Sequence, residues 1–244
     1  MSVFPDENSA GLLAAPPAAL RYEHGSLDPG DVSLQLVELI APRSRVLDVG
    51  CGTGVITDVI RSLRSASVIG IEPDPTRVQR ARARGLEVHE GVLTAEFLRQ
   101  HERFDVIVFA DVLEHLPNPA AVVLLAKEGL KPGGSVVISV PNVAHWFVRS
   151  ALFWGSFDYE ESGLMDATHL RWFTRQTIRE LLERLGFEVT ALRCTVNIGL
   201  PSYSQRAPWR WMRPGLRRRL VGRLAALWPG LFGCQHIVRA TLPQ

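Results

Sequence analysis

Short apolar runs alternate with amphipathic segments along most of this chain. The runs are rich in Val, Ile and Leu, as strands buried inside a parallel sheet are. Between them, apolar residues recur every three or four positions, which is typical of helices that cover a sheet. The alternation predicts a doubly wound α/β fold with a mostly parallel sheet and right-handed crossovers. The predicted strands are 46–49, 67–71, 86–89, 104–110, 135–140, 187–196 and 235–240, and the predicted helices are 31–40, 55–60, 76–84, 120–129, 175–185 and 216–228.

A glycine turn follows the first predicted strand, in the stretch RVLDVGCGTG at 45–54. Glycine allows tight turns and lets backbone N–H groups approach a ligand closely. The spacing differs from a dinucleotide turn, because Val55 stands where the third glycine would be. No Gly-Lys-Ser/Thr follows, which excludes the phosphate-binding P-loop.

The string from Asp48 to Gly54 resembles the first motif of class I S-adenosylmethionine-dependent methyltransferases. The resemblance implies a seven-stranded Rossmann-like sheet whose last two strands form a hairpin at the edge. It also implies that the acidic residue and the turn hold the amino-acid end of S-adenosylmethionine. The residues that it assigns to this task are Asp48, Gly50, Cys51, Gly52 and Gly54.

Two further turns are expected to complete the cofactor site. Glu72, at the tip of the second strand, is placed to accept hydrogen bonds from both ribose hydroxyls, with Pro73 and Asp74 beside it. Asp74 also fits the alternative role of a helix N-cap. Gly91 and Val92 follow the third strand. The family often has an aspartate where Val92 stands, so the adenine contact is expected from backbone or from a neighbour such as Glu90.

The fourth strand ends in a segment that resembles the family's methyl-transfer region. Ligands of open α/β sheets bind at the carboxyl ends of the strands. Ala110, Asp111 and Val112 are therefore expected beside the sulfonium. His115, in the same segment, is interpreted either as a base or as a residue that fixes the loop by a hydrogen bond.

The segment 142–173 is predicted to form a small substrate cap. Its aromatic residues suit a pocket lining and equally suit a small helical cap that buries itself. Within it, the string from Asp166 to Thr174 resembles bacterial methyltransferases linked with sugar, lipid and quinone tailoring. A hydroxyl acceptor requires a base. His169, oriented by Asp166, is the first choice, followed by His145 and His115.

The segment 206–230 is predicted to be an insertion between the last two strands. After Glu188 the chain has no acidic residue and nine arginines. The helix 216–228 is expected to place its apolar residues on one face and most of its arginines on the other. Three interpretations remain open: contact of 209–228 with an anionic membrane surface, a helix packed on the body, and nucleic-acid binding. The expected apolar face is Leu216, Leu220, Val221, Leu224, Leu227 and Trp228.

Composition sets the remaining expectations. The three cysteines are widely separated, which suggests neither a disulfide framework nor a metal site and favours a reducing compartment. The start of the sequence lacks the pattern of a signal peptide, and we expect neither a signal peptide nor an apolar run that could span a bilayer. The predicted location is the cytoplasm, with the inner face of the membrane as the alternative. Residues 1–20 are predicted to be flexible, and 21–244 to form a single domain.

Together these features predict an enzyme that moves a methyl group from S-adenosylmethionine to an oxygen or nitrogen. The acceptor is expected to be a small molecule, a sugar or a lipid-linked compound. One alternative is a non-catalytic, cofactor-binding protein of the same fold. Another is a nucleic-acid methyltransferase, which would often carry Asn/Asp-Pro-Pro-aromatic after the fourth strand, where this chain has Ala110-Asp111-Val112-Leu113.

Overall fold

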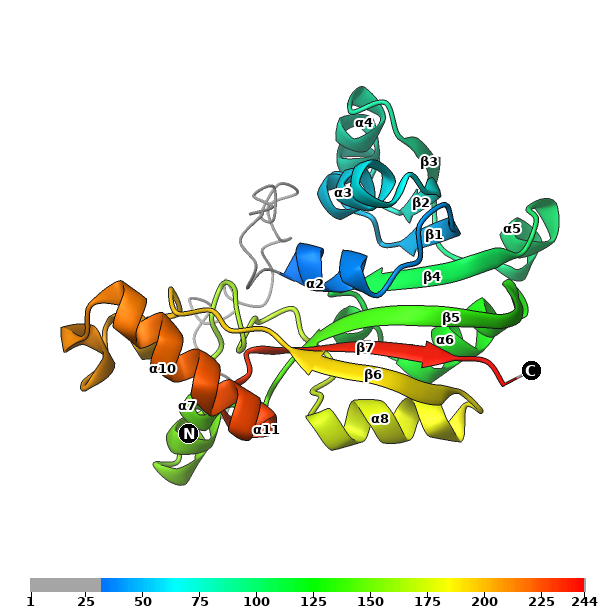
Figure 1. Ribbon diagram of the computed structural model, residues 1–244. Helices are drawn as coiled ribbons and strands as arrows, with labels where there is room; N and C mark the ends of the chain where they lie inside the picture. The colour runs from blue at the N-terminus through cyan, green and yellow to red at the C-terminus, as the bar shows by residue number, and fades with distance from the viewer. Residues whose placement is uncertain (1–31, 244) are drawn as a thin grey trace, which may run out of the picture.

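Seven strands form one sheet in the order β3-β2-β1-β4-β5-β7-β6 in the computed structural model, which describes residues 32–243 (Figure 1). The first five strands run parallel, and β7 runs antiparallel to both β5 and β6. The doubly wound sheet and the hairpin at its edge are therefore confirmed. The strands are β1 (Arg45–Val49), β2 (Ser67–Glu72), β3 (Glu87–Glu90), β4 (Phe104–Ala110), β5 (Leu130–Pro141), β6 (Glu188–Cys194) and β7 (Gln235–Thr241).

Helices cover both faces of this sheet. On one face, α5 (Ala95–Gln100), α6 (Pro119–Glu128) and α8 (Arg175–Arg184) bury apolar residues against the central strands. On the other face, α2 (Val32–Glu38) and α3 (Val55–Arg64) do the same. A third helix, α4 (Pro75–Ala83), packs its buried Val78 and Ala81 beside β3. Burial on both faces explains why the central strands are apolar throughout.

Local sequence signals set where several helices begin. Asn118 accepts a hydrogen bond from the N–H of Ala121 at 3.2 Å and precedes a proline at the first position of α6. Thr174 and Thr177 form a reciprocal capping box at the start of α8. The sequence prediction missed α5, a helix of only 6 residues that Thr94 caps. The fifth strand is longer than predicted, because β5 begins at Leu130 rather than at residue 135.

The predicted cap and insertion form one helical group beyond the carboxyl end of β5. The cap contributes α7 (Trp146–Phe153). The predicted insertion contributes the short turn η3 (Trp209–Trp211) and α10 (Pro214–Leu227), while α9 (Pro201–Ser204) precedes it and α11 (Pro229–Phe232) extends beyond residue 230. Figure 1 shows α7, α10 and α11 gathered at one end of the molecule. The Trp146 ring packs edge-on against Tyr203 and tilted against Trp209, at centroid distances of 5.7 and 6.4 Å. The Asn142 side chain donates to the carbonyls of Gly230 and Gly233.

The predicted apolar face of the helix 216–228 is partly wrong. Val221 and Ala225 are buried, whereas Leu216 and Leu227 are exposed. Arg217, expected on the polar face, turns inward and donates to the Tyr203 carbonyl at 2.8 Å. The reason is that α10 packs on the body through a narrow stripe that includes Val221 and Ala225, so part of its apolar surface stays exposed to solvent.

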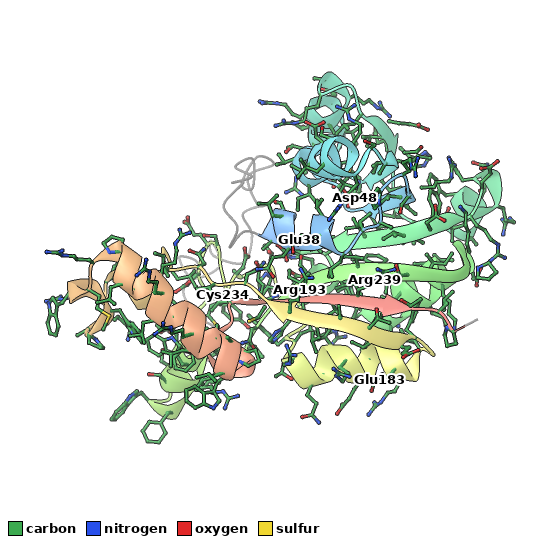
Figure 2. All side chains as sticks on the ribbon, viewed as in Figure 1. Glu38, Asp48, Glu183, Arg193, Cys234 and Arg239 are labelled. Carbon is green, nitrogen blue, oxygen red and sulfur yellow. The ribbon has the colours of Figure 1, made fainter. Side chains whose placement is uncertain are left out.

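An ion pair links the sheet edge to the helix in front of it. Arg193 on β6 and Glu38 on α2 face one another, with 2.6 Å between Nη1 and Oε2 (Figure 2). Both side chains are largely exposed, so this pair adds little to stability. The predicted flexible segment 1–20 lies outside the described residues. Between residues 32 and 243, no helix has both the length and the apolar character needed to cross a bilayer.

Candidate active site

A cavity of about 890 Å³ lies at the carboxyl ends of β1, β2, β4 and β5. This edge is where ligands of doubly wound sheets bind. The helical group forms one wall through Leu164, Asn197 and Leu200. The cavity therefore lies between the sheet and the predicted cap.

The glycine turn after β1 is held against the end of β2 by backbone hydrogen bonds. The N–H groups of Gly50 and Cys51 both donate to the Ile71 carbonyl, at 2.8 and 3.0 Å. The N–H of Gly52 donates to Oε2 of Glu72 at 2.9 Å. Gly50 has a φ of +74°, and a Cβ there would lie 2.7 Å from Val112. Only glycine fits this close approach.

Asp48 is buried at the floor of the cavity. Its Oδ2 accepts a hydrogen bond from the Thr57 hydroxyl at 2.6 Å. Its Oδ1 has no hydrogen-bond partner among the described residues. Burial raises the pKa of Asp48 to about 6, the Thr57 bond opposes this, and the charge of Glu72 adds to it. A cationic group placed in the cavity would satisfy Oδ1 and restore the charge of the carboxylate.

Glu72 lies at the tip of β2 and is 3% exposed. Its Oε1 accepts the N–H of Asp74 at 3.1 Å, and its Oε2 accepts Gly52 as described above. Arg77 on α4 lies 3.9 Å from Oε1. Each carboxylate oxygen can accept a further hydrogen bond, so Glu72 is fixed in place with capacity left for hydroxyl donors.

Most of the residues predicted to bind the cofactor line this one cavity. Gly54 and Asp74 do not. Gly54 begins α3 in the left-handed conformation, and a Cβ there would lie 2.3 Å from Leu86. Asp74 caps α4 by accepting the N–H groups of Thr76 and Arg77, which is its alternative role. The predicted residues that line the cavity are Asp48, Gly50, Cys51, Gly52, Glu72, Pro73, Gly91, Val92, Ala110, Asp111 and Val112.

Asp111 is held rigidly where β4 ends. It has a φ of 53°, unusual for a residue with a side chain. Its Oδ1 accepts the Ser139 hydroxyl at 2.7 Å, and both of its oxygens accept the Gln235 amide. Two other strands thus fix this carboxylate at the cavity.

Beside Asp111, three titratable side chains meet in the cavity wall. Glu114, in the turn η2 (Leu113–His115), is 1% exposed, and neither of its carboxylate oxygens has a hydrogen-bond partner among the described residues. Burial raises its pKa well above the usual range, and Asp111 and Asp166 add to the shift. One ligand atom each from Glu114, His115 and His169 lie within 4.8 Å of one another. The sequence suggested no metal ligands, but these three groups could together hold a metal ion.

Hydrogen bonds bring the cap string onto the end of β4. The N–H groups of Leu170 and Arg171 donate to the Glu114 carbonyl at 2.8 and 2.9 Å. His115 Nδ1 lies 3.1 Å from the Thr168 carbonyl. The imidazole rings of His115 and His169 are 5.0 Å apart. Of the predicted base candidates, His169 and His115 both line the cavity.

Two other predicted catalytic residues, Asp166 and His145, do not line the cavity. Asp166 is buried, and its Oδ1 accepts the N–H and hydroxyl of Thr168. His145 is also fully buried, with its Nε2 2.9 Å from the Tyr203 hydroxyl. Burial lowers the pKa of His145 to about 4. His145 caps α7 and does not line the cavity, so the structure gives no support to its role as a base.

The sequence prediction missed Glu114 and Gln235 as site residues. The sequence did carry a signal for Glu114, since it is an acidic residue between apolar neighbours, Leu113 and Leu116, shortly after a buried strand. No pattern in the sequence pointed to Gln235, because the pairing of β7 with β5 is what brings it to Asp111.

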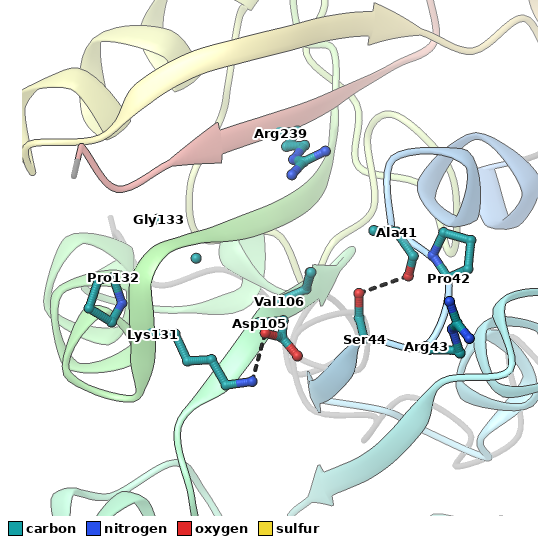
Figure 3. Close-up of a pocket in the computed structure, with 11 residues that line it drawn as sticks. Ala41, Pro42, Arg43, Ser44, Asp105, Val106, Lys131, Pro132, Gly133 and Arg239 are labelled. Carbon is teal, nitrogen blue, oxygen red and sulfur yellow. Dashed lines mark hydrogen bonds and ion pairs between the residues drawn. The ribbon is translucent and has the colours of Figure 1, made fainter.

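A smaller hollow of about 330 Å³ lies at the opposite edge of the sheet (Figure 3). Lys131 Nζ lies 2.7 Å from Oδ1 of Asp105, and the Ser44 hydroxyl donates to the Ala41 carbonyl at 2.7 Å. Asp105 also accepts the backbone N–H of Arg45. Because these groups satisfy one another, the larger cavity is the candidate active site.

Comparisons with known proteins agree with this geometry. The chain is 38% identical over 104 residues to a ubiquinone biosynthesis O-methyltransferase of Pseudomonas putida, a match that covers 40% of this chain and 44% of that protein. It resembles a SAM-dependent methyltransferase structure from Archaeoglobus fulgidus with a TM-score of 0.59 and 19% identity, covering 86% of this chain and 92% of the other. It also resembles a [4+2]-cyclase, SpnF, with a TM-score of 0.54 and 18% identity, covering 87% and 80%. At such identities, the structural matches establish the fold alone.

The sheet order, the glycine turn and the acidic residue at the tip of β2 define a class I S-adenosylmethionine-dependent methyltransferase fold. Residues 23–192 match the family described as a methyltransferase domain, and the chain belongs to that family. The chain spans less than half the length of the ubiquinone biosynthesis relative it matches.

Proposed function

We propose that this protein is an enzyme that transfers a methyl group from S-adenosylmethionine to an oxygen of a small molecule. The observation that carries the proposal is the single cavity that joins Asp48 and Glu72 to His115 and His169. The first pair suits the two ends of the cofactor that carry hydrogen-bond donors, the ammonium and the ribose. The second pair supplies imidazole groups where an acceptor would lie.

The chemistry is an in-line displacement. The bond from the methyl carbon to sulfur breaks, its electron pair neutralises the sulfonium, and a new bond forms to the acceptor oxygen. The acceptor proton passes to a base, for which we propose His169. The cofactor is already activated, so the main task of the protein is to align the two reactants.

The proposed acceptor is a small molecule with an apolar body and a hydroxyl. Leu116, Val122, Leu164 and Leu200 line the same cavity as the two imidazoles. Apolar walls with a few polar groups suit such a ligand. The name of the ubiquinone biosynthesis relatives is consistent with a phenolic or quinol-like acceptor.

The first test is transfer of labelled methyl from S-adenosylmethionine to a panel of phenolic acceptors. We expect label in product with the wild-type chain and a loss of at least about a hundredfold in His169→Ala, the order contributed by general base catalysis. Binding of S-adenosylmethionine, measured by calorimetry, should remain in this variant. Unchanged turnover would remove His169 from the role of base.

The same assay in the presence of EDTA tests whether Glu114, His115 and His169 bind a metal ion or whether His169 acts as a base without one. If His169 acts as a free base, turnover continues in EDTA. If EDTA abolishes turnover and Mg²⁺ or Zn²⁺ restores it, Glu114, His115 and His169 bind a cation instead.

The same fold occurs in the [4+2]-cyclase SpnF, so a second candidate is a protein that keeps the fold and the cofactor cavity but transfers no methyl group. Cofactor binding without label in any small-molecule, lipid or nucleic-acid fraction of a cell extract would support that alternative. Methyl label in nucleic acid would instead support the alternative of a nucleic-acid methyltransferase.

A further inference from the structure

The outward face of α10 carries both leucines and arginines. Leu216, Arg223 and Leu227 are spaced by 7 and 4 residues, which places them on one stripe of the helix. Leu216 is 60% and Leu227 69% exposed. Arg219 lies one turn before Arg223 and is exposed as well. The opposite stripe, with Val221 and Ala225, packs on the body.

A second exposed apolar group lies at the end of α7. Phe153 and Trp154 are each 80% exposed, and Leu152 is 51% exposed. The rings of Phe153 and Trp154 touch at a centroid distance of 5.3 Å. Large aromatic side chains seldom cluster on a free surface without a partner.

Internal contacts join α7 and the insertion into one body. The guanidinium of Arg206 lies 4.8 Å from the centre of the Phe147 ring. Trp146 packs with Tyr203 and Trp209, as described above. Figure 1 shows α7, α10 and α11 at the same end of the molecule. The exposed groups thus belong to a single helical layer.

We propose that this layer binds peripherally to the surface of an anionic lipid bilayer. Leucine and aromatic side chains enter the headgroup region, and neighbouring arginines contact lipid phosphates. Among the described residues, Arg213, Arg219 and Arg223 form no ion pair, so their charges are available to an anionic partner. The arginines on the same face as the leucines can extend their charged ends toward phosphate while their stems stay in apolar surroundings.

Two other partners fit this surface less well. A second copy of the chain would bring arginines against arginines, because residues 189–244 contain no carboxylate side chain. Nucleic acid would attract the arginines but would leave Leu216, Leu227 and Phe153 without apolar contacts. A bilayer satisfies both groups at once.

The test is co-sedimentation of the full chain with phosphatidylcholine vesicles, with and without phosphatidylglycerol. We expect binding that requires phosphatidylglycerol and weakens with salt. The double variant Arg219→Glu/Arg223→Glu should weaken it at least about tenfold, and Leu227→Gln/Phe153→Gln should also weaken it. Matched controls on the body are Arg99→Glu and Leu63→Gln, which are exposed far from the layer along the chain and should bind as the wild type does.

All of these side chains are exposed, so the variants should keep the wild-type unfolding temperature. The proposal fails if the layer variants bind vesicles as the controls do, or if binding ignores phosphatidylglycerol. It also fails if the layer variants lose affinity for DNA or RNA, or lose a dimer in solution, with no change in vesicle binding. Binding is measured without turnover, so the result does not depend on the proposed reaction.

Discussion

Gln235 donates its side-chain amide to both carboxylate oxygens of Asp111, at 3.0 Å to Oδ1 and 2.9 Å to Oδ2. The two residues come from the first position of β7 and the turn after β4. The contact holds an acidic group at the cavity in a backbone conformation that residues with side chains rarely adopt. An amide suits this place because it can donate to a charged partner.

Replacing this amide by a carboxylate should destabilise the protein. In Gln235→Glu, two carboxylates would lie within about 3 Å, and one would have to bind a proton. We expect a loss of about 1–3 kcal/mol in unfolding free energy at pH 7, larger than that of Gln235→Ala. The folded-state pKa of the new acid would be raised, so the loss should shrink as the pH falls toward 4. Denaturant unfolding at several pH values measures this, and an equal loss at every pH would contradict it.

The sequence predicts the sheet well because each strand carries its own signal. Buried parallel strands need continuous apolar runs, and the glycine turn marks the strand at which the order reverses. Pairing between distant strands leaves no such local signal. That is why Glu72 could be placed from the sequence, whereas the contact of Gln235 with Asp111 could not.

Removing the Glu72 carboxylate should weaken cofactor binding. Glu72→Ala is expected to reduce affinity for S-adenosylmethionine at least tenfold, about 1.4 kcal/mol, if the carboxylate accepts the ribose hydroxyls as proposed. Calorimetric titration gives the affinity. Glu87→Ala, an exposed position on β3, is the matched control. Unchanged affinity in Glu72→Ala would move the ribose contact elsewhere.

Two glycines of the same turn should respond differently to alanine. In Gly54→Ala, the new methyl group would lie 2.3 Å from Leu86 Cδ1 at a φ of +79°, so we expect a stability loss of about 2–4 kcal/mol. In Gly52→Ala the methyl group meets nothing within 4 Å, so only the positive φ costs about 1 kcal/mol.

Gly52 lines the cavity and Gly54 does not, so the two variants should rank in the opposite order when the loss of cofactor affinity is measured. Gly52→Ala is expected to lose more affinity for S-adenosylmethionine than Gly54→Ala does. Thermal unfolding and calorimetry on both variants measure the two effects. If Gly54→Ala instead caused the larger loss both of stability and of cofactor affinity, the two effects would not be separable within this turn.

Buried histidines should make the protein sensitive to mild acid. Burial lowers the pKa of His145 to about 4, and burial together with Arg175 lowers that of His236 to about 4. Unfolding returns each to its usual value near 6.5, so the unfolded state binds more protons between these values. The contribution of these two histidines should therefore be complete above pH 6.5 and fall as the pH drops toward 4, whereas the raised pKa values of Asp48 and Glu114 act in the opposite direction.

The variant His145→Gln isolates one of these contributions. It should be less stable at pH 7, because it loses the contact with the Tyr203 hydroxyl. Its further loss between pH 7 and pH 5 should be smaller than that of the wild type by about 2 kcal/mol. Denaturant unfolding at the two pH values measures this difference, and parallel pH profiles would contradict it.

The catalytic end of the site was predictable only in part. The histidines of the cap string stood out as reactive groups, and two candidates, His115 and His169, line the cavity. The sequence ranked His145 behind His169, but its neighbours Trp146 and Phe147 pack against Tyr203, Trp209 and Arg206, which places this turn in the helical layer. An imidazole in the cavity differs from a structural one by its burial. Burial depends on contacts between distant parts of the chain, which a local sequence pattern does not predict.

The place of β7 also has a consequence for synthesis of the chain. β7 is made after the other six strands of this sheet, yet it pairs on both sides, with β5 and with β6. Until it leaves the ribosome, β6 has no neighbour, β5 has an open edge, and Gln235 is missing beside Asp111. The nascent chain therefore cannot complete its cavity gradually, and a ligand present in the cell would meet a finished site only after residue 241 has emerged.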